Sequence, residues 1–246
     1  MRVSYIVIFW IMTAVLFDFG GTLDSNGIAW KDSFLPIYRK YGVRVAQEKF
    51  DRAFYDADDY FHVNHAVLGM GFAQTVTLQV RDVFKNLALE DAAAAKAVAE
   101  EFLLLARANF RAIAPALDAL AEQYRLGVVS NFYGNMEAVL ESEGLDRWFK
   151  AAADSRAVGV EKPDAKLFSH ALEKLGEKAA GSVMVGDNIK RDMAGAANIG
   201  MTGALLWGDR FAQGNPPPQA RDCIVLKNLS ELPALLQATR TEAGRL

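Results

Sequence analysis

One carboxylate in this sequence lies where nucleophilic chemistry is expected, and that residue is Asp18. It directly follows the apolar run 14–17, and Gly20 and Gly21 come shortly after it. A short run that is rich in Val, Leu and Phe and bounded by glycine is typical of a buried strand whose end faces a crevice. The pattern therefore predicts a carboxylate nucleophile at the tip of a strand.

Polar residues also follow three later apolar runs. The carboxyl ends of parallel strands meet at one edge of a sheet, so residues in such positions are expected to share a crevice with Asp18. Each of them, taken singly, fits a turn, a helix cap or a solvated surface position equally well. They are Ser130 and Asn131, Lys162 before Pro163, and Asp187 with Asp192 five residues further on.

The elements that must position these residues alternate along the second half of the chain. Short apolar runs predict strands, and the segments between them predict helices. This alternation is typical of an α/β fold with a mostly parallel sheet and helices on both faces. After the strand at 14–17, we predict strands at 126–130, 151–153, 182–186, 204–207 and 223–226, and helices at 117–124, 135–143, 165–175 (started by Pro163), 192–199 and 231–238.

A long helical block separates the first predicted strand from the others. Its segments contain few helix breakers and repeat apolar residues at helical spacing, and the pattern changes after Pro115. We therefore expect a helical domain inserted where the crevice opens. The predicted helices in it are 47–60, 72–86 and 91–110, and the predicted division is a core of 12–25 and 111–246, a helical insert of 26–110, and an extension or mis-assigned start at 1–11.

Composition excludes several classes of partner. The 246 residues carry a formal net charge of -3 and no run rich in Lys or Arg, which argues against a nucleic-acid partner. A single cysteine, Cys223, cannot form an internal disulfide, and no metal-ligand spacing surrounds it. Both observations fit a protein of a reducing compartment, and we expect a cytoplasmic location.

The first residues resemble a membrane signal only superficially. The apolar run 3–17 is short for a bilayer span, no small-residue cleavage site follows it, and its end is needed for the strand that carries Asp18. We therefore predict no membrane partner, and we expect Met12 to be the natural start or 1–11 to be an extension. If it is present, the apolar segment 3–12 would be able to cover a partner surface in a homodimer.

Taken together and in order, the four segments "DFGGTL", "VVSN", "EKPDAKLF" and "VGDNIKRD" resemble the motifs of the haloacid dehalogenase-like hydrolase superfamily. The resemblance covers residues 14–207 and leaves the helical insert as the cap domain of that family. It implies a Rossmann-like core and hydrolysis of a small phosphorylated metabolite. By this resemblance Asp18 is the nucleophile and forms an aspartyl-phosphate that water later cleaves.

The resemblance also implies a cation and a phosphate site. A carboxylate that attacks a phosphate dianion needs a positive charge between them, and Mg²⁺ held by carboxylates is the usual answer. The implied metal ligands are Asp18, the backbone carbonyl of Gly20, Asp187 and Asp192. The implied phosphate-binding residues are Ser130, Asn131, Lys162 and Gly21, with Ser130 and Lys162 also taking part in catalysis.

Gly20 departs from the family pattern. Phosphatases of this family carry an aspartate there, whose carbonyl binds the metal and whose side chain protonates the leaving oxygen. Glycine keeps the first role and loses the second, and general acid-base catalysis contributes about 10² to 10⁴ in rate. Side chains of the cap are candidates to replace it, although the same segment also fits a polar helix surface: His62, His65, Asp58 and Asp59.

The missing acid leaves several functions open. Our first interpretation is a Mg²⁺-dependent phosphatase acting slowly, or on acyl and aryl phosphates that need little protonation. A 2-haloacid dehalogenase also needs no acid at this position, but it has no use for the acidic pair in "GDNIKRD". A binding or regulatory module that has lost turnover is a third reading. A phosphonate hydrolase is a minor fourth, since it needs a cap lysine, for which Lys31 and Lys49 are weak candidates.

Overall fold

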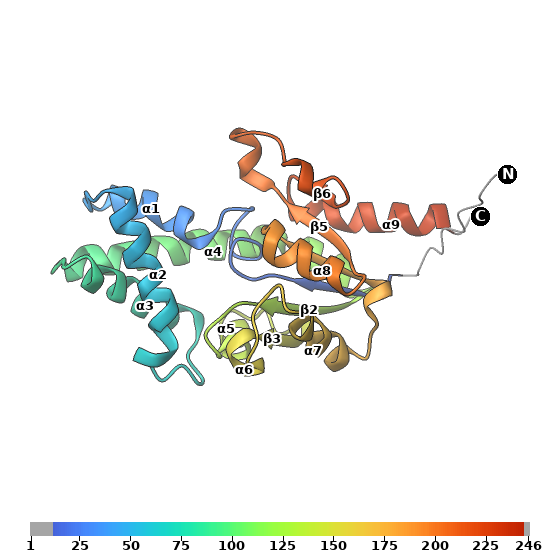
Figure 1. The fold of residues 1–246 in the computed structure, drawn as a ribbon, viewed down its shortest axis with the longest axis horizontal. Helices are drawn as coiled ribbons and strands as arrows, with labels where there is room; N and C mark the ends of the chain where they lie inside the picture. Colours follow the sequence, from blue (N-terminus) through green and yellow to red (C-terminus); the bar gives the residue numbers. More distant parts are fainter. Residues whose placement is uncertain (1–11, 244–246) are drawn as a thin grey trace.

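The computed structural model describes residues 12–243, and within them it has the predicted α/β fold. Six parallel strands form one sheet in the order β3-β2-β1-β4-β5-β6 (Figure 1). The strands are β1 (Ala14–Phe17), β2 (Arg125–Ser130), β3 (Phe149–Asp154), β4 (Ser182–Gly186), β5 (Thr202–Leu206) and β6 (Ile224–Leu226). Each predicted strand is thus confirmed: β1 and β4 have the predicted bounds, and the ends of the other strands differ from the predicted ones by at most two residues.

Both faces of the sheet are covered, because alternate side chains of β1 enter two separate cores. Val15 and Phe17 pack in a core with residues of α5 (Met136–Ser142) and α9 (Leu232–Ala243). Leu16 packs on the opposite face with residues of α7 (Ala165–Leu175) and α8 (Ala194–Asn198). Burial on both faces explains why the strands are continuous apolar runs. The short α6 (Ser155–Val158) follows β3.

Four helices follow β1 and include the predicted helical block. The predictions at 47–60 and 72–86 are confirmed by α2 (Gln47–Asn64) and α3 (Phe72–Asn86). Their shared core is aromatic: Phe34 and Phe102 stack with centroids 3.9 Å apart, and Tyr38 and Phe50 meet edge to face. The four helices are α1 (Trp30–Lys40), α2 (Gln47–Asn64), α3 (Phe72–Asn86) and α4 (Ala92–Ala121), and α1 to α3 gather at one end of the molecule (Figure 1).

The predicted helix break near Pro115 is wrong, because α4 continues through it. Proline in a helix interior removes one hydrogen bond and costs about 3 kcal/mol. Residues around it nevertheless bury their side chains in the main core, and burying one large aliphatic side chain returns about 1.5–3 kcal/mol. These residues are Ile113, Leu117 and Leu120, so packing maintains the helix. The predicted division between 110 and 111 falls inside α4.

A second local prediction also needs correction. The helix at 165–175 is confirmed, but Pro163 does not start it. Asp164 is its N-cap and accepts a hydrogen bond from the Lys166 N–H at 2.8 Å, while the Lys162–Pro163 peptide is cis. The predicted helix 192–199 is preceded by a π-helical turn, Ile189–Met193, and α8 begins only at Ala194.

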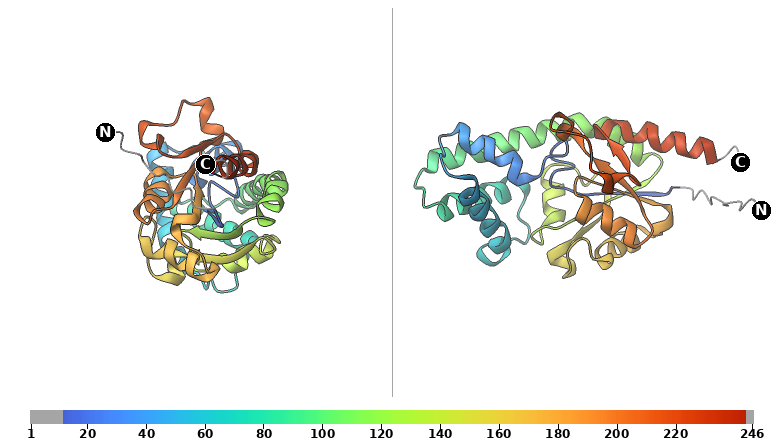
Figure 2. Two further views of the ribbon diagram at one scale, coloured as in Figure 1. Left: turned by 90° about the vertical axis from the view of Figure 1, so that its right-hand side faces the viewer. Right: turned by 45° about the horizontal axis from the view of Figure 1, so that its top comes forward.

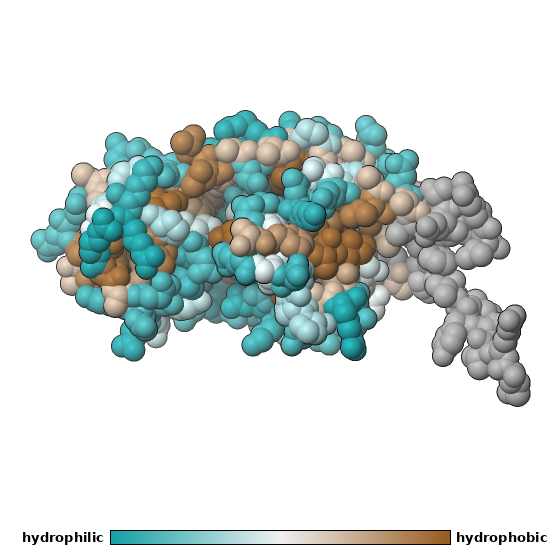
Figure 3. Space-filling view, turned by 90° about the horizontal axis from the view of Figure 1, so that it is seen from above, coloured by the Kyte–Doolittle hydropathy of each residue, from teal (hydrophilic) through white to brown (hydrophobic). Residues whose placement is uncertain are grey.

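The helices and the surface of the described part of the chain bear on the expectations about a membrane span and an apolar surface. Within residues 12–243 no helix has both the length and the apolar character to cross a bilayer. The face in Figure 3 carries several apolar patches separated by hydrophilic side chains. Helix α9 packs beside α4 (Figure 2). The predictions for 1–11 concern residues outside the described part of the chain, and the homodimer stays a prediction.

Candidate active site

The predicted site residues converge where the chain reverses direction across the sheet. From β1 the order runs outward through β2 to β3, and β4 then begins the other half beside β1. In open parallel sheets, ligands bind at the carboxyl ends of the strands at this switch point. Asp18 directly follows β1, Ser130 ends β2, and Asp187 directly follows β4.

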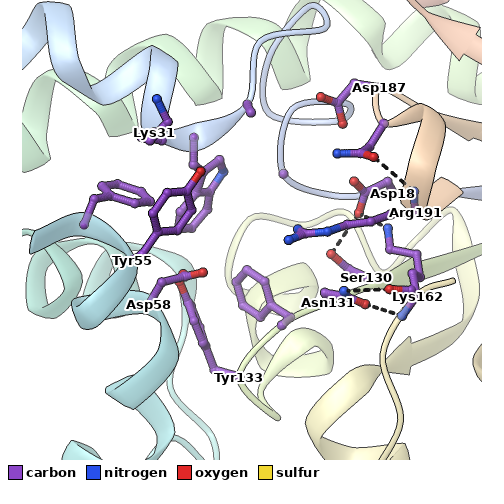
Figure 4. Close-up of a pocket in the computed structure, with 16 residues that line it drawn as sticks. Asp18, Lys31, Tyr55, Asp58, Ser130, Asn131, Tyr133, Lys162, Asp187 and Arg191 are labelled. Atoms are coloured by element: carbon purple, nitrogen blue, oxygen red, sulfur yellow. Dashed lines mark hydrogen bonds and ion pairs between the residues drawn. The ribbon is translucent and has the colours of Figure 1, made fainter. Parts of the chain in front are cut away.

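Asp18 is held rigidly through one of its oxygens. Its Oδ1 accepts hydrogen bonds from the Phe19 N–H at 2.7 Å and from Ser130 Oγ at 2.9 Å, and Lys162 Nζ lies 2.7 Å away (Figure 4). Among the described residues no donor contacts Oδ2. The Asp18 side chain lines a cavity, so Oδ2 is the oxygen available for bond formation.

Lys162 is the buried cation of the site. Its Nζ lies 2.7 Å from an oxygen of Asp18 and 2.7 Å from one of Asp192. Burial by itself lowers the pKa of Lys162, but the two carboxylates outweigh it and raise that pKa. Asn131 fixes the backbone here: its Oδ1 accepts from the Lys162 N–H at 2.7 Å, and its Nδ2 donates to the Lys162 carbonyl at 3.3 Å.

Three buried carboxylates face this one lysine. Asp18, Asp187 and Asp192 each bring one oxygen within 4.8 Å of the others. Burial, reinforced by the neighbouring carboxylates, raises the pKa of Asp187 well above its ordinary value. Burial also raises the pKa of Asp192 to about 6, although Lys162 opposes the change. The excess negative charge and the oxygen donors fit a hard divalent cation such as Mg²⁺.

The loop after β4 explains how Asp192 reaches this cluster. Asn188 accepts hydrogen bonds from the backbone N–H groups of Lys190 and Arg191, each at 3.0 Å, and so caps the π-helical turn. The Asn188 N–H donates in return to Asp192 Oδ2 at 2.9 Å. The side chain of Asp192 is fully buried, so both of its oxygens are fixed toward the core.

Gly21 does not lie in the cavity lining, unlike the other predicted phosphate-binding residues. Its N–H donates to Asp24 Oδ1 at 2.7 Å. Its φ is +90°, and a Cβ there would lie 2.9 Å from the carboxylate of Asp187. Glycine is required here because it permits the close approach of the first loop to Asp187.

Trp30 lies beside Gly20, where a side chain would otherwise project. A Cβ on Gly20 would lie 3.1 Å from Trp30 Nε1, and that Nε1–H donates a short hydrogen bond to Asp24. Burial raises the pKa of Asp24 to about 7, although the Gly21 and Trp30 donors work against this. Sequence reasoning missed Trp30 and Asp24, because no local pattern distinguishes either residue.

The cavity has two unlike sides, and its volume is about 200 Å³. One side is polar and carries the groups around Asp18. The other is mainly aromatic and comes from α1, α2 and the loop after β2. Its rings belong to Trp30, Phe54, Tyr55, Phe132 and Tyr133, and the charged side chains of Lys31, Asp58 and Arg191 also line the cavity (Figure 4).

Of the four candidates for a replacement acid, the structure brings only Asp58 to the cavity lining. Asp58 accepts a short hydrogen bond from Tyr133 Oη, and burial raises its pKa. His65 instead pairs with Asp82 at 2.7 Å. Lys31 lines the cavity and lies 2.7 Å from Asp32, whereas Lys49 does not line it.

Comparison with known proteins agrees with this architecture. A family model, haloacid dehalogenase-like hydrolase, matches residues 12–200. Glyceraldehyde 3-phosphate phosphatase of Methanothermobacter thermautotrophicus is 32% identical over 124 residues, which are 49% of this chain and 54% of that protein. Pyrimidine 5'-nucleotidase YjjG of Escherichia coli is 34% identical over 122 residues, 49% of this chain and 53% of that protein.

Each of these matches spans about half of the relative's length. The solved L-2-haloacid dehalogenase of Xanthobacter autotrophicus superposes with a TM-score of 0.58 over 92% of this chain and 99% of that one, at 20% identity. This likeness shows a shared fold. Given the family model and the convergence of the four motifs at one sheet edge, the chain belongs to the haloacid dehalogenase-like hydrolases.

Proposed function

We propose that this hydrolase is a Mg²⁺-dependent phosphatase that acts through an aspartyl-phosphate on Asp18. The observation that carries the proposal is the state of that carboxylate: three donors hold Oδ1, while Oδ2 has none among the described residues. Of the two curated relatives, one is a phosphatase by name and the other a 5'-nucleotidase, which supports the same reaction class.

The chain's own residues account for the two steps of the reaction. Asp18 Oδ2 attacks phosphorus and forms an O–P bond, while the bond to the leaving oxygen breaks and that oxygen departs with the electron pair. Water then attacks phosphorus while the bond between phosphorus and Asp18 Oδ2 breaks, which restores the carboxylate. The protons of the water end on the released inorganic phosphate and on the departed oxygen. Ser130 and Lys162 hold the nucleophile and offer donors to the phosphoryl oxygens.

The metal requirement follows from the charges at this site. Asp18, Asp187 and Asp192 are the residues that would hold Mg²⁺, which supplies positive charge where the carboxylate meets the phosphoryl group. The single positive charge of Lys162 does not balance the negative charge of the three carboxylates. A substrate that brings further negative charge would therefore bind weakly without a divalent cation.

The cavity favours small substrates with good leaving groups. Gly20 offers no acid, and the indole of Trp30 borders that position. Aryl phosphates release a phenolate and acyl phosphates release a carboxylate, and neither leaving group needs prior protonation. The aromatic side fits a flat ring. A volume of 200 Å³ lies below the roughly 300–1,000 Å³ typical of pockets for drug-sized ligands.

The test is hydrolysis of para-nitrophenyl phosphate with Mg²⁺. We expect turnover that Asp18→Asn lowers by about 10³-fold or more and that a chelator abolishes. Asp222→Asn is the matched control, because this exposed carboxylate does not line the cavity. Activity that persists in the chelator would contradict the proposal.

Two further measurements distinguish the alternatives. Chloride release from 2-chloropropionate in the chelator, without phosphate hydrolysis, would replace the proposal by a dehalogenase. Mg²⁺ binding by calorimetry without either activity would indicate a regulatory module.

A further inference from the structure

Arg191 is a cation that the proposed reaction has not yet used. Its side chain reaches into the cavity from the core side, near Asp18, and extends toward Tyr55 and Asp58 (Figure 4). Its backbone N–H donates to Asn188 Oδ1 at 3.0 Å, which fixes the base of the side chain. The guanidinium forms no ion pair with any carboxylate of the described chain.

The other two cations of the cavity are already neutralised. Lys162 Nζ lies 2.7 Å from carboxylate oxygens of Asp18 and Asp192. Lys31 Nζ lies 2.7 Å from Asp32 and 3.3 Å from Asp51. Among the lining residues, Arg191 is therefore the positive charge without a carboxylate in contact.

Its position relative to the nucleophile indicates which part of a substrate it would meet. In phosphoryl transfer the attacking and leaving oxygens lie roughly in line with phosphorus. Ser130 and Lys162 hold Asp18 Oδ1 on the core side, and residues of α2 line the other side of the cavity, so an in-line leaving oxygen would lie toward α2. Figure 4 shows the side chain of Arg191 ending between Asp18 and the residues Tyr55 and Asp58 of α2.

We propose that Arg191 stabilises the negative charge on the departing oxygen, in place of the acid that Gly20 lacks. The inference rests on the proposed phosphatase function. A guanidinium does not give up its proton at ordinary pH, so it cannot protonate the leaving group. Its N–H groups can nevertheless donate charge-assisted hydrogen bonds to an oxyanion, and one such donor contributes about 10² to 10³ in rate.

This role differs from that of Asp58, an acidic group of α2 that also lines the cavity. Asp58 accepts a hydrogen bond from the buried Tyr133. The positive charge of Arg191 works to lower the pKa of Asp58, while burial raises it more strongly. Because the Asp58 carboxyl is held by Tyr133, we assign stabilisation of the leaving oxygen to Arg191, with Asp58 as the competing acid that the experiment also tests.

The test is a series of substituted phenyl phosphates that differ in the pKa of the leaving phenol. We expect Arg191→Met to lower kcat/KM about 10²-fold on phenyl phosphate and less than about threefold on 2,4-dinitrophenyl phosphate, because the poorer leaving group depends more on the donor. Arg191→Lys should restore part of the loss. Lys190→Met is the matched control, since this neighbouring side chain is exposed and does not line the cavity.

The possible outcomes distinguish failure of this inference from failure of the proposed phosphatase function. An equal loss across the series, or a loss confined to KM, would mean that Arg191 only anchors substrate. If kcat/KM depends more steeply on the pKa of the leaving phenol in Asp58→Asn, and not in Arg191→Met, then Asp58 is the acid. Either result overturns the inference while hydrolysis that depends on Asp18 persists. If no hydrolysis depends on Asp18, both proposals fail.

Discussion

The two sides of the cavity are built by different kinds of interaction. On the core side, Asp18 and Lys162 are buried and bound by charge-assisted hydrogen bonds between strand ends. On the helical side, aromatic rings line the wall, and the Tyr55 side chain is 50% exposed. The difference indicates that the sheet fixes the reactive groups, whereas packing of α1 and α2 shapes what they accept.

The largest effect should follow from removing the central charge of the core side. Lys162→Met leaves Asp18 and Asp192 without their shared cation. We expect kcat on para-nitrophenyl phosphate to fall about 10³-fold, and the free energy of unfolding to fall by about 3–5 kcal/mol. Lys166→Met, an exposed lysine of α7, should change neither quantity. Near-normal activity of the Lys162 variant would show that the core side does not depend on this charge.

A smaller effect should come from Asp24, which connects the first loop to Trp30. Its pKa is about 7 in the folded protein and near 3.8 in the unfolded chain, so the folded state retains the proton between these values. Stability should therefore decrease as pH rises from about 4 to about 7. The total change in the free energy of unfolding is about 4 kcal/mol, since one pKa unit corresponds to about 1.4 kcal/mol.

Urea unfolding of wild type and Asp24→Asn across this pH range measures that contribution. Relative to the asparagine variant, wild type should lose stability as pH rises, and the difference should become constant above pH 7. Parallel curves for the two proteins would mean that Asp24 titrates at its ordinary pKa. Asp222→Asn, in an exposed position, serves as the control.

The smallest effect concerns the border between the two sides. Gly20→Asp alone places its Cβ against the indole of Trp30, so we expect little gain in turnover of alkyl phosphates. Combined with Trp30→Leu, it should raise kcat/KM for glycerol 2-phosphate relative to para-nitrophenyl phosphate about tenfold, below the full range of general acid catalysis. Trp30→Leu alone is the control. An unchanged ratio in the double variant would indicate that another group already assists the leaving oxygen.

Much of the fold could be predicted because its signals are local. The buried strand at 182–186 is an apolar run between breakers, and the helix at 72–86 has apolar residues at helical spacing; both occur as predicted. The break at Pro115 was wrong because burial along α4 offsets the local cost of proline. That burial depends on tertiary contacts, which a local pattern does not contain.

The site likewise contains residues that the sequence predicted and residues that only the structure reveals. Asp18, Ser130, Lys162, Asp187 and Asp192 converge as expected, because each belongs to one of the four motifs. Asp18, Ser130 and Asp187 lie at strand ends, whereas Lys162 lies in the loop before α7 and Asp192 in the turn after β4. Their catalytic and metal-binding roles stay predictions, as does the cytoplasmic location.

Other site residues could not have been found from local patterns. Trp30 and Arg191 reach the cavity only through the packing of α1 and the turn before α8. Gly21 was placed in the phosphate site by its motif, but its N–H is taken by Asp24.

The unbroken helix α4 has a consequence for engineering. It contains 30 residues and is about 45 Å long, and it packs against α1 and α3 near one end and beside α9 near the other. The Asn109 side chain on it also donates to the backbone carbonyls of Leu23 and Ser25. An exchange of the helical block with a related protein should therefore keep α4 whole. A junction at residue 110 would interrupt a helix that packs against both the helical block and α9.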